Sequence, residues 1–540
     1  MKNIKNLILA AVGGFAVLAS CANAANPLDE PLANVAEVAE VVEVAEVAEI
    51  TTIVTAETPT AAIQPVATVA EPQAASTIIT LSGDNAQING NGAEFIRINA
   101  SEGVFSSGIL TINTAGTYVL TGELTGQILV DAADEVVRLI LDGVNIHNEN
   151  GLAIFAPRAA QLEITILGEN TVSDGTNHPD DNANATIYIQ PNLRIDGEGV
   201  LTVRSGFRHG LRSQGVLTIY GGVFDIATTD GNALQGRDGV IIHGGDFDLV
   251  GGGEGDGIRA SRENDPERGF ITINGGNFTI TAGDDGLQAE TTIEINGGNF
   301  TITAVDDGMT TSGSVIVTDG VIHILDSYEG IEGLNITILG GNITIFARDD
   351  AINARDSNEP TGGTRGRYGI NPEMFVRIAG GHVVLHALND GIDSNGNTFL
   401  EGGLLQITAP SHGFGADAIE QDGIFTVTGG ELITAGTVRS VYAGSTQPVL
   451  MVTFPQRLAA GTLVELRDFG GNLLLSHVAE NSFPASAFSS SVFEIGESYL
   501  LYVDGERISE VLLGSVFMRV NVGNVGNAGN RAAPPRGRGR

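Results

Sequence analysis

A tandem repeat, most often 21 to 23 residues long, constrains the fold of this 540-residue chain more than any other feature. Each unit carries a Gly-Gly pair, and Asp319-Gly320 fills the single gap in the series. Repetition at this length is typical of a solenoid, in which each unit packs only on its neighbours. The pairs begin at Gly221, Gly244, Gly275, Gly297, Gly340, Gly380, Gly402 and Gly429.

Within one unit, short segments alternate apolar and polar residues, which predicts strands that turn one face inward. Residues 271–273, 278–280 and 287–289 are three such segments, separated by turns. The 73 glycines and 5% aromatic residues also favour an all-β chain with many turns. An apolar residue recurs two positions after each glycine pair and predicts one internal column: Phe224, Phe247, Phe278, Phe300, Ile322, Ile343, Val383, Leu405 and Leu432.

These patterns predict an all-β fold in which parallel strands wind into a β-helix of about 22 residues per coil. A leucine-rich repeat has a similar period, but its LxxLxLxxN signature is absent and nothing reads as a helical half. We place the β-helix at residues 77–444 and a small C-terminal β cap at 445–515, where the repeat stops.

The two ends have compositions of their own. Residues 1–20 combine Lys2 and Lys5 with an apolar run too short for a membrane span, which predicts an export signal. Leu18-Ala19-Ser20-Cys21 resembles a bacterial lipobox and predicts lipidation of Cys21; ordinary cleavage after Ala24, with loss of Cys21, is the alternative. Residues 21–76 read as a flexible acidic tether and 516–540 as a disordered tail. We therefore expect an exported protein, held at the cell surface by a lipid anchor alone, or else secreted.

The charge of the chain limits its partners. The formal net charge is −38, and both lysines lie in the predicted signal. This balance disfavours nucleic acid. Any attraction to an acidic polymer must therefore be carried by arginine or by bound cations.

Acidic residues recur eight and nine positions after the second glycine, so they are expected to stack from coil to coil. Two carboxylates one strand spacing apart, about 4.8 Å, repel by about 1 kcal/mol in water and more where they are partly buried. Calcium prefers oxygen ligands at about 2.4 Å and fits between such carboxylates. The alternative is that Asp-Gly is simply good turn chemistry. Asp417 lies in a similar local sequence. The predicted metal ligands are Asp230, Asp256, Asp284, Asp285, Asp306, Asp307, Glu329, Asp349, Asp350 and Asp390.

A polar stripe lies one residue beyond the apolar position that follows this turn. Arg212, Arg259, Gln288, Asn353 and Asp393 are the predicted carbohydrate-binding residues, because such side chains can hydrogen-bond sugar hydroxyls or carboxylates. A solvated face is the alternative. No tryptophan occurs, so an aromatic platform is poorly supported. The complete stripe is Arg212, Gln235, Arg259, Gln288, Thr310, Glu332, Asn353, Asp393 and Glu420.

The amino-acid sequence also resembles that of a known family. The run AGTYVLTGELTGQILVDAADEVVRLILDGVNIHNENGLAIFAP, then LEITILGENTVSDG, then the repeated DDG turns resemble bacterial carbohydrate-binding domain-containing proteins. The resemblance implies an extracellular, calcium-containing, right-handed parallel β-helix related to pectate lyases, which binds cellulose-like or acidic plant polysaccharides without established catalysis. It carries calcium over to Asp284, Asp285, Asp306, Asp307, Asp349, Asp350 and Asp390, whereas Tyr328-Glu329 and Asn389 depart from the double aspartate.

Three functions follow as alternatives. The first is a surface-tethered polysaccharide-binding module with a calcium-stabilised β-helix and no catalytic residue. The second is a calcium-dependent polysaccharide lyase, in which calcium acidifies the proton α to a uronate carboxylate and an arginine removes it. Arg208, Arg212, Arg237 and Arg259 are the candidate bases, with a salt-bridge role as the alternative. The third function is a structural adhesin.

Overall fold

The computed structural model describes residues 76–98, 107–176, 178, 184–357, 371–409 and 417–522. The chain divides into two units, residues 1–67 and 68–540, and every described residue belongs to the second. The predicted signal, Cys21, nearly all of the predicted tether and most of the predicted tail lie outside the described residues. No helix in the described part of the chain is long and apolar enough to cross a membrane.

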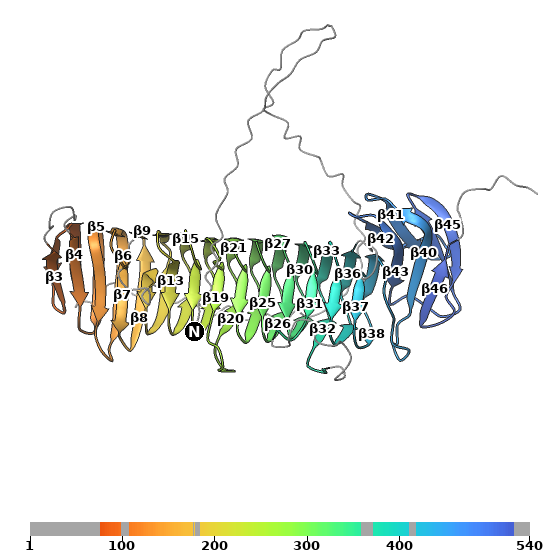
Figure 1. Cartoon of the computed structure of the whole chain (residues 1–540), viewed down its shortest axis with the longest axis horizontal. Helices are drawn as coiled ribbons and strands as arrows, with labels where there is room; N and C mark the ends of the chain where they lie inside the picture. The colour runs from red at the N-terminus through yellow and green to blue at the C-terminus, as the bar shows by residue number, and fades with distance from the viewer. Residues whose placement is uncertain are drawn as a thin grey trace, which may run out of the picture. The chain divides into compact units, whose positions relative to one another are not determined.

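Successive coils stack as a parallel β-helix, and each coil contributes three strands (Figure 1). In one coil these are β20 (Phe270–Ile273), β21 (Asn277–Ala282) and β22 (Leu287–Ala289). Each pairs in parallel with its equivalent in the next coil, β23 (Thr292–Ile295), β24 (Asn299–Ala304) and β25 (Met309–Thr311). The predicted all-β fold class is therefore confirmed.

The strands form three columns along the β-helix. The first-strand column also contains β8 (Gln161–Leu167), β11 (Asn192–Gly197), β14 (Val216–Ile219), β17 (Gly239–Ile242), β26 (Ser314–Val317), β29 (Asn335–Ile338), β32 (Phe375–Ile378), β35 (Asn397–Leu400) and β38 (Phe425–Val427). The second-strand column also contains β9 (Glu169–Asp174), β12 (Val200–Ser205), β15 (Val223–Thr228), β18 (Asp246–Gly251), β27 (Val321–Ser327), β30 (Asn342–Ala347), β33 (His382–Ala387), β36 (Leu404–Thr408) and β39 (Glu431–Ala435). The third-strand column also contains β7 (Ile154–Arg158), β10 (Ala185–Ile189), β13 (His209–Ser213), β16 (Leu234–Gly236), β19 (Ile258–Ala260), β28 (Ile331–Gly333), β31 (Ile352–Ala354), β34 (Ile392–Ser394) and β37 (Ile419–Gln421).

The predicted apolar column runs through the core. Its members are cross-strand neighbours from Phe224 to Leu432. The rings of Phe224, Phe247, Phe278 and Phe300 lie parallel, with centroids 4.9, 4.7 and 4.6 Å apart. These rings are at most 4% exposed. The spacing follows from the strand spacing of about 4.8 Å, so the register of the sheet sets the aromatic stack.

The glycine pairs make the turn that leads into this column. Gly276 has φ +117°, a conformation that side chains rarely adopt, and a Cβ there would lie 2.9 Å from the carbonyl oxygen of Gly245. The coils therefore approach too closely at this corner for any larger residue, which explains why the repeat is punctuated by glycine.

The ends of the β-helix differ from the repeat. The N-terminal strands are β1 (Thr77–Gly83), β2 (Ala86–Asn89), β3 (Ala93–Ile98), β4 (Ser107–Ile112), β5 (Gly116–Asp131) and β6 (Val136–Asn148). The β1–β2 and β3–β4 pairs are antiparallel, which the repeat did not predict. These pairs lie at the end of the stack, where strands have no preceding coil on which to pair.

The C-terminal cap contains two sheets. The strands β40 (Val449–Leu458), β43 (Phe483–Ser489) and β46 (Phe517–Asn521) continue the large sheet through β39. A separate four-stranded sheet has the order β42 (Leu473–Val478), β41 (Leu463–Arg467), β44 (Ser498–Val503) and β45 (Glu506–Leu512). The predicted end of the cap at residue 515 is wrong, because β46 pairs with β40 through residues assigned to the disordered tail.

Candidate functional site

A ladder of buried side chains precedes the third-strand column. The second residue of each acidic pair is buried, and Asp285 and Asp307 are 3% and 7% exposed. The first residue is less buried: Asp306 is exposed, whereas Asp284 is half-buried beside Asp285. The acidic ladder, as we call it, comprises Asp256, Asp285, Asp307, Glu329, Asp350 and Asp390, all between 0% and 7% exposed.

Backbone hydrogen bonds position this ladder. The Oδ1 atoms of Asp256, Asp285 and Asp307 each accept the N–H of the ladder residue in the next coil, at 3.2, 2.9 and 3.1 Å. Asp350 Oδ1 accepts the N–H of Asp390 at 2.8 Å in the same way. Upstream, Asn232 Oδ1 accepts the N–H of Asp256 at 2.9 Å. One oxygen of each of these carboxylates is therefore a structural link between coils, and the other remains for a different partner.

The second oxygen turns toward the polar stripe, three residues further along the chain. Asp256 Oδ2 accepts from Arg259 Nη1 at 3.0 Å, and Asp285 Oδ2 accepts from Gln288 Nε2 at 2.8 Å. Ladder and stripe are therefore joined by hydrogen bonds into one polar network rather than two separate features.

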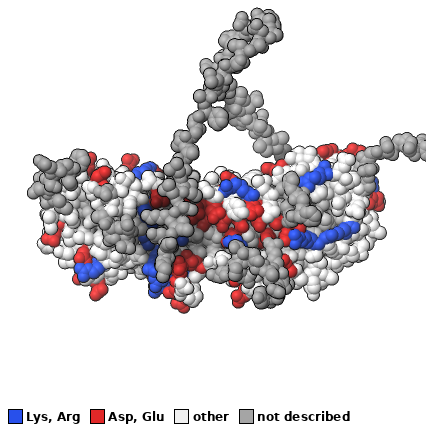
Figure 2. Space-filling model, viewed as in Figure 1, with Lys and Arg blue, Asp and Glu red and all other residues white. Residues whose placement is uncertain are grey.

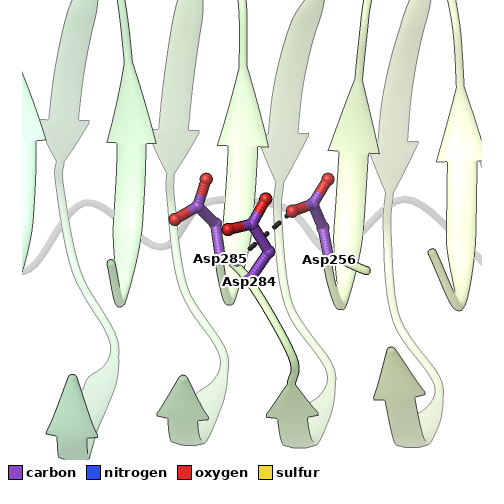
Figure 3. Close-up of side chains that lie close together, drawn as sticks. All are labelled: Asp256, Asp284 and Asp285. Atoms are coloured by element: carbon purple, nitrogen blue, oxygen red, sulfur yellow. Dashed lines mark hydrogen bonds between the residues drawn. The ribbon is translucent and has the colours of Figure 1, made fainter. Parts of the chain in front are cut away.

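Carboxylates of the ladder and the stripe gather into three acidic groups. Within each group one oxygen from every residue lies within 4.8 Å of the others. In the first group, Asp284 and Asp285 lie beside Asp256 of the preceding coil (Figure 3). The groups are Asp256, Asp284 and Asp285; Asp307, Glu329 and Glu332; and Asp350, Asp390 and Asp393. Acidic side chains accordingly collect over the middle coils (Figure 2).

Burial makes these carboxylates difficult to ionise. Desolvation, opposed in part by the bond from the next coil, raises the pKa of Asp285 to about 9. Desolvation likewise raises the pKa of Asp307 to about 7 and of Asp390 to about 8. The pKa of Glu329 is raised by burial and by its neighbour Glu332. At neutral pH several of these groups need a proton or a cation.

The hydrogen-bond ladder changes at Glu329. Asn353 Nδ2 donates to both carboxylate oxygens of Glu329, each at 3.0 Å. Asn353 is 5% exposed, and its Oδ1 accepts no hydrogen bond from any described residue. Asn353 is the cross-strand neighbour of Asp393, a member of the third acidic group. An unsatisfied amide oxygen thus lies between the second and third acidic groups.

The stripe has the predicted register but not the predicted exposure. Each member from Arg212 to Glu420 is the cross-strand neighbour of the next. However, Gln235, Glu332, Asn353, Asp393 and Glu420 are only 4% to 8% exposed, so the alternative of a solvated face is wrong for them. Neighbouring side chains cover them; for example, Arg355 Nε forms an ion pair with Glu332 Oε2 at 2.6 Å. Gln288, Thr310 and Glu332 line a hollow of about 160 Å³.

Several predicted metal ligands lie elsewhere. Asp230 is exposed and outside the three acidic groups, because the ladder residue of its coil is Asn232. Asp306 and Asp349 occupy the outward position and are also outside these groups. Counting from the glycines failed at Asp230 because coil lengths differ. Glu332 and Asp393 belong to acidic groups but were not among the predicted metal ligands, because their stripe position alone suggested sugar contacts.

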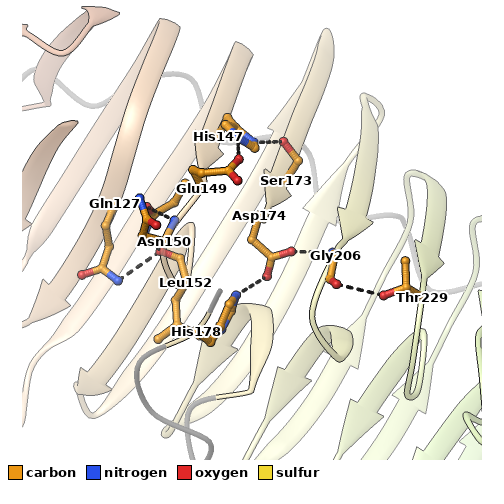
Figure 4. Close-up of polar contacts among 11 residues, drawn as sticks. Gln127, His147, Glu149, Asn150, Leu152, Ser173, Asp174, His178, Gly206 and Thr229 are labelled. Atoms are coloured by element: carbon orange, nitrogen blue, oxygen red, sulfur yellow. Dashed lines mark hydrogen bonds and ion pairs between the residues drawn. The ribbon is translucent and has the colours of Figure 1, made fainter. Parts of the chain in front are cut away.

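A separate polar cluster lies on the N-terminal coils (Figure 4). His147 joins Ser173 Oγ at 2.9 Å and Glu149 Oε2 at 3.2 Å, a serine-histidine-acid series. The side chains of His147 and Glu149 are 44% and 57% exposed, so the series sits in water rather than in a pocket. His147 and Ser173 are cross-strand neighbours, and Asp174 Oδ1 accepts the N–H of Gly206 at 2.7 Å. We assign this cluster to coil stacking.

Comparison with known proteins agrees with the predicted resemblance. Residues 106–366 match the family model for carbohydrate-binding domain-containing proteins. The resemblance to this family is confirmed. A carbohydrate-binding domain-containing protein of Acetivibrio thermocellus is 32% identical over 148 residues, which are 26% of this chain and 49% of that protein. The aligned region thus spans about half the length of that relative.

One solved structure is similar to part of this chain, with a low structural similarity score. It is described as the polysaccharide lyase-like protein from C. thermocellum, gadolinium derivative. Its sequence is 28% identical, and the alignment covers 45% of this chain and 96% of that chain with a TM-score of 0.40. The region matched by the carbohydrate-binding family contains the first two acidic groups and Asp350, while Asp390 and Asp393 lie beyond it.

Proposed function

We propose that the surface formed by the acidic ladder and the polar stripe binds a polysaccharide, and that calcium in the three acidic groups supports both the fold and the binding. The observation that carries this proposal is the position of the acidic groups: buried carboxylates border a continuous row of amide, hydroxyl and charged side chains. The family match of residues 106–366 supports a carbohydrate as the partner.

The residues present fit calcium. Every candidate ligand is an oxygen, which is the donor that calcium prefers, and six to eight ligands can be completed by carbonyls and water. The buried Oδ1 of Asn353 has no other partner among the described residues and adds a neutral oxygen donor. Calcium would also remove the need to protonate Asp285 and Asp390 at neutral pH.

Bound calcium would let so acidic a chain approach an acidic polymer. At a net charge of −38 the protein repels polyanions in general. Cations in the acidic groups would replace this repulsion by local attraction and would take a sugar carboxylate or hydroxyl as a further ligand. Lipidation of Cys21 and export would place this surface outside the cell, where plant-type or acidic polysaccharides are available.

A pull-down with insoluble cellulose and soluble polygalacturonate tests this proposal. We expect binding to polygalacturonate that chelator weakens and that added calcium restores. Asp350→Asn with Asp390→Asn should weaken binding, whereas Asp349→Asn, at a half-buried position outside the three groups, should leave it unchanged. Absence of binding to every glycan, with and without calcium, would contradict the proposal and favour a purely structural adhesin.

One observation favours a lyase as the second candidate. Burial lowers the pKa of Arg212, and the charges of Arg237, Arg259 and Arg208 lower it further. Arg212, whose pKa is lowered, is the candidate base for the proton α to a uronate carboxylate; the bond to the leaving sugar oxygen would then break, that oxygen would take a proton from solvent, and an unsaturated uronide would remain. Ultraviolet absorbance of that product, lost in Arg212→Gln, would support a lyase; no absorbance change with calcium present would contradict it.

A further inference from the structure

Four arginines gather at one end of the polar stripe, where Arg259 bonds Asp256 of the first acidic group, and they lie two or more coils from the second acidic group. We call Arg208, Arg212, Arg237 and Arg259 the arginine cluster. Arg212 lies on β13 and Arg259 on β19, while Arg208 directly precedes β13 and Arg237 directly follows β16. In a chain with a net charge of −38, such a concentration of positive charge requires a physical explanation.

The charge of the arginine cluster is not balanced within the described structure. Arg259 pairs with Asp256 at 3.0 Å, and the other three form no ion pair with a described residue. Arg212 donates through Nη1 to the amide oxygen of Asn184, and its buried Nε has no acceptor among the described residues. Among the described residues, Arg237 reaches only the amide oxygen of Gln214, at 3.5 Å. Three guanidinium groups therefore keep donors available for an anion.

His209, next to Arg208 in the chain, contributes no negative charge to the cluster. His209 Nδ1 accepts the N–H of Asn232 at 2.9 Å, which is the geometry of a neutral ring. Desolvation, with further effects from Arg212, Arg208 and Arg259, lowers the pKa of His209 to about 3. The neutral ring of His209 therefore does not offset the positive charges of Arg208, Arg212 and Arg259.

The arginine cluster opens onto the same surface as the acidic groups. Arg212, Gln235 and Arg259 are successive members of the stripe, which continues in register to Asp393. Seven coil spacings separate Arg212 from Asp393, or about 34 Å at about 4.8 Å each. One extended polymer chain can therefore contact both ends.

We propose that the arginine cluster is a carboxylate-binding subsite for an acidic polysaccharide and that it acts without metal. The proposed polysaccharide function is its premise: one chain would be held at two places, by arginine at one end and through calcium at the other. Guanidinium groups bind carboxylates with paired, charge-assisted hydrogen bonds. Two linked contacts strengthen binding beyond either alone when the ligand is long enough to reach both.

The test measures polygalacturonate binding to the full chain by calorimetry, with calcium and with EDTA. We expect EDTA to leave a weaker, salt-sensitive component, and Arg212→Gln with Arg237→Gln to weaken that component about tenfold or more. Arg507→Gln, on the cap and paired with Glu510, is the matched control and should leave it unchanged. Fully methyl-esterified polygalacturonate should lose the component, since it offers no carboxylate. A melting curve for each variant verifies the fold.

Three results would overturn the inference: an EDTA-resistant component unchanged by the double variant, no such component at all, or equally tight binding of single-stranded DNA, which would indicate charge alone. In the first two cases calcium-dependent binding can persist, so the proposed function would stand. Loss of all polysaccharide binding in the parent protein, with and without calcium, would overturn both.

Discussion

The phenylalanine column and the acidic ladder repeat a side chain on successive coils of the same β-helix, with opposite consequences. Phe224, Phe247, Phe278 and Phe300 stack with centroids 4.6 to 4.9 Å apart, so each added coil buries more apolar surface. The ladder brings carboxylates together at the same interval, so each added coil adds repulsion. Repetition of an apolar group therefore stabilises a β-helix directly, whereas repetition of a carboxylate requires a proton or a cation.

The ladder shows how far the backbone can compensate. A hydrogen bond from the next coil holds one oxygen of Asp256, Asp285 and Asp307, which orients the side chain. That bond lowers the pKa of Asp285, but desolvation is larger and the pKa remains raised to about 9. The backbone thus determines where the charge lies, and a cation or proton must neutralise it.

The largest effect is expected from breaking the phenylalanine column. Phe278→Ala should lower the free energy of unfolding by about 3 to 5 kcal/mol, because it opens a cavity between two neighbouring rings. Phe469→Ala, at a cap position that is 65% exposed, is the control and should change it by less than about 0.5 kcal/mol. Denaturant unfolding measures both. Equal losses in the two variants would show that the ring stack is not a stabilising feature.

The next largest effect is expected from removing the charge of two ladder aspartates while keeping their Oδ1 hydrogen-bond acceptors. Asp285→Asn with Asp307→Asn keeps the Oδ1 acceptor for the next coil and removes two charges. Calcium at a hundredfold excess over its dissociation constant would stabilise the parent by about 2.7 kcal/mol, and the double variant should lose most of that response. Asp306→Asn with Asp349→Asn, at outward positions, should retain it. Melting with and without calcium gives the comparison, and identical responses in all three proteins would contradict it.

Stability should also depend on pH once calcium is removed. The folded pKa values of Asp285, Asp307 and Asp390 are raised to about 9, 7 and 8, so the folded chain binds more protons than the unfolded one between pH 4 and 9. Stability must then fall as pH rises through this window. In EDTA the melting temperature should be several degrees higher at pH 5 than at pH 8, and calcium should reduce the difference. A melting temperature in EDTA that rises with pH would be inconsistent with protonated carboxyls in the ladder.

The smallest effect is expected at Asp230. Asp230→Asn should alter neither calcium content nor polysaccharide binding and should change the free energy of unfolding by less than about 0.5 kcal/mol. The side chain is exposed and outside the three acidic groups. A loss of bound calcium in this variant would mean that the ladder extends further than the structure indicates.

The sequence predicts the fold better than the site because the strand register follows from the repeat, whereas the burial and partners of a polar side chain depend on the neighbouring coil. Alternation in each unit was enough to predict the phenylalanine column and the order of the stripe. It could not show which aspartate of a pair is buried, since the answer depends on the neighbouring coil. Asn232 rather than Asp230 joins the ladder for this reason. Asn353 and Glu329, which are 24 residues apart, meet only through the stacking of β31 on β28.

The central claim, that the acidic groups hold calcium, is tested most directly by combining elemental analysis with a melting curve. Protein purified without chelator should contain calcium, and EDTA should remove it and lower the melting temperature at pH 7.5. Added calcium should restore both. Protein that contains no calcium and melts at the same temperature with and without EDTA would contradict the account, and the carboxylates of the ladder would then be neutralised by protons alone.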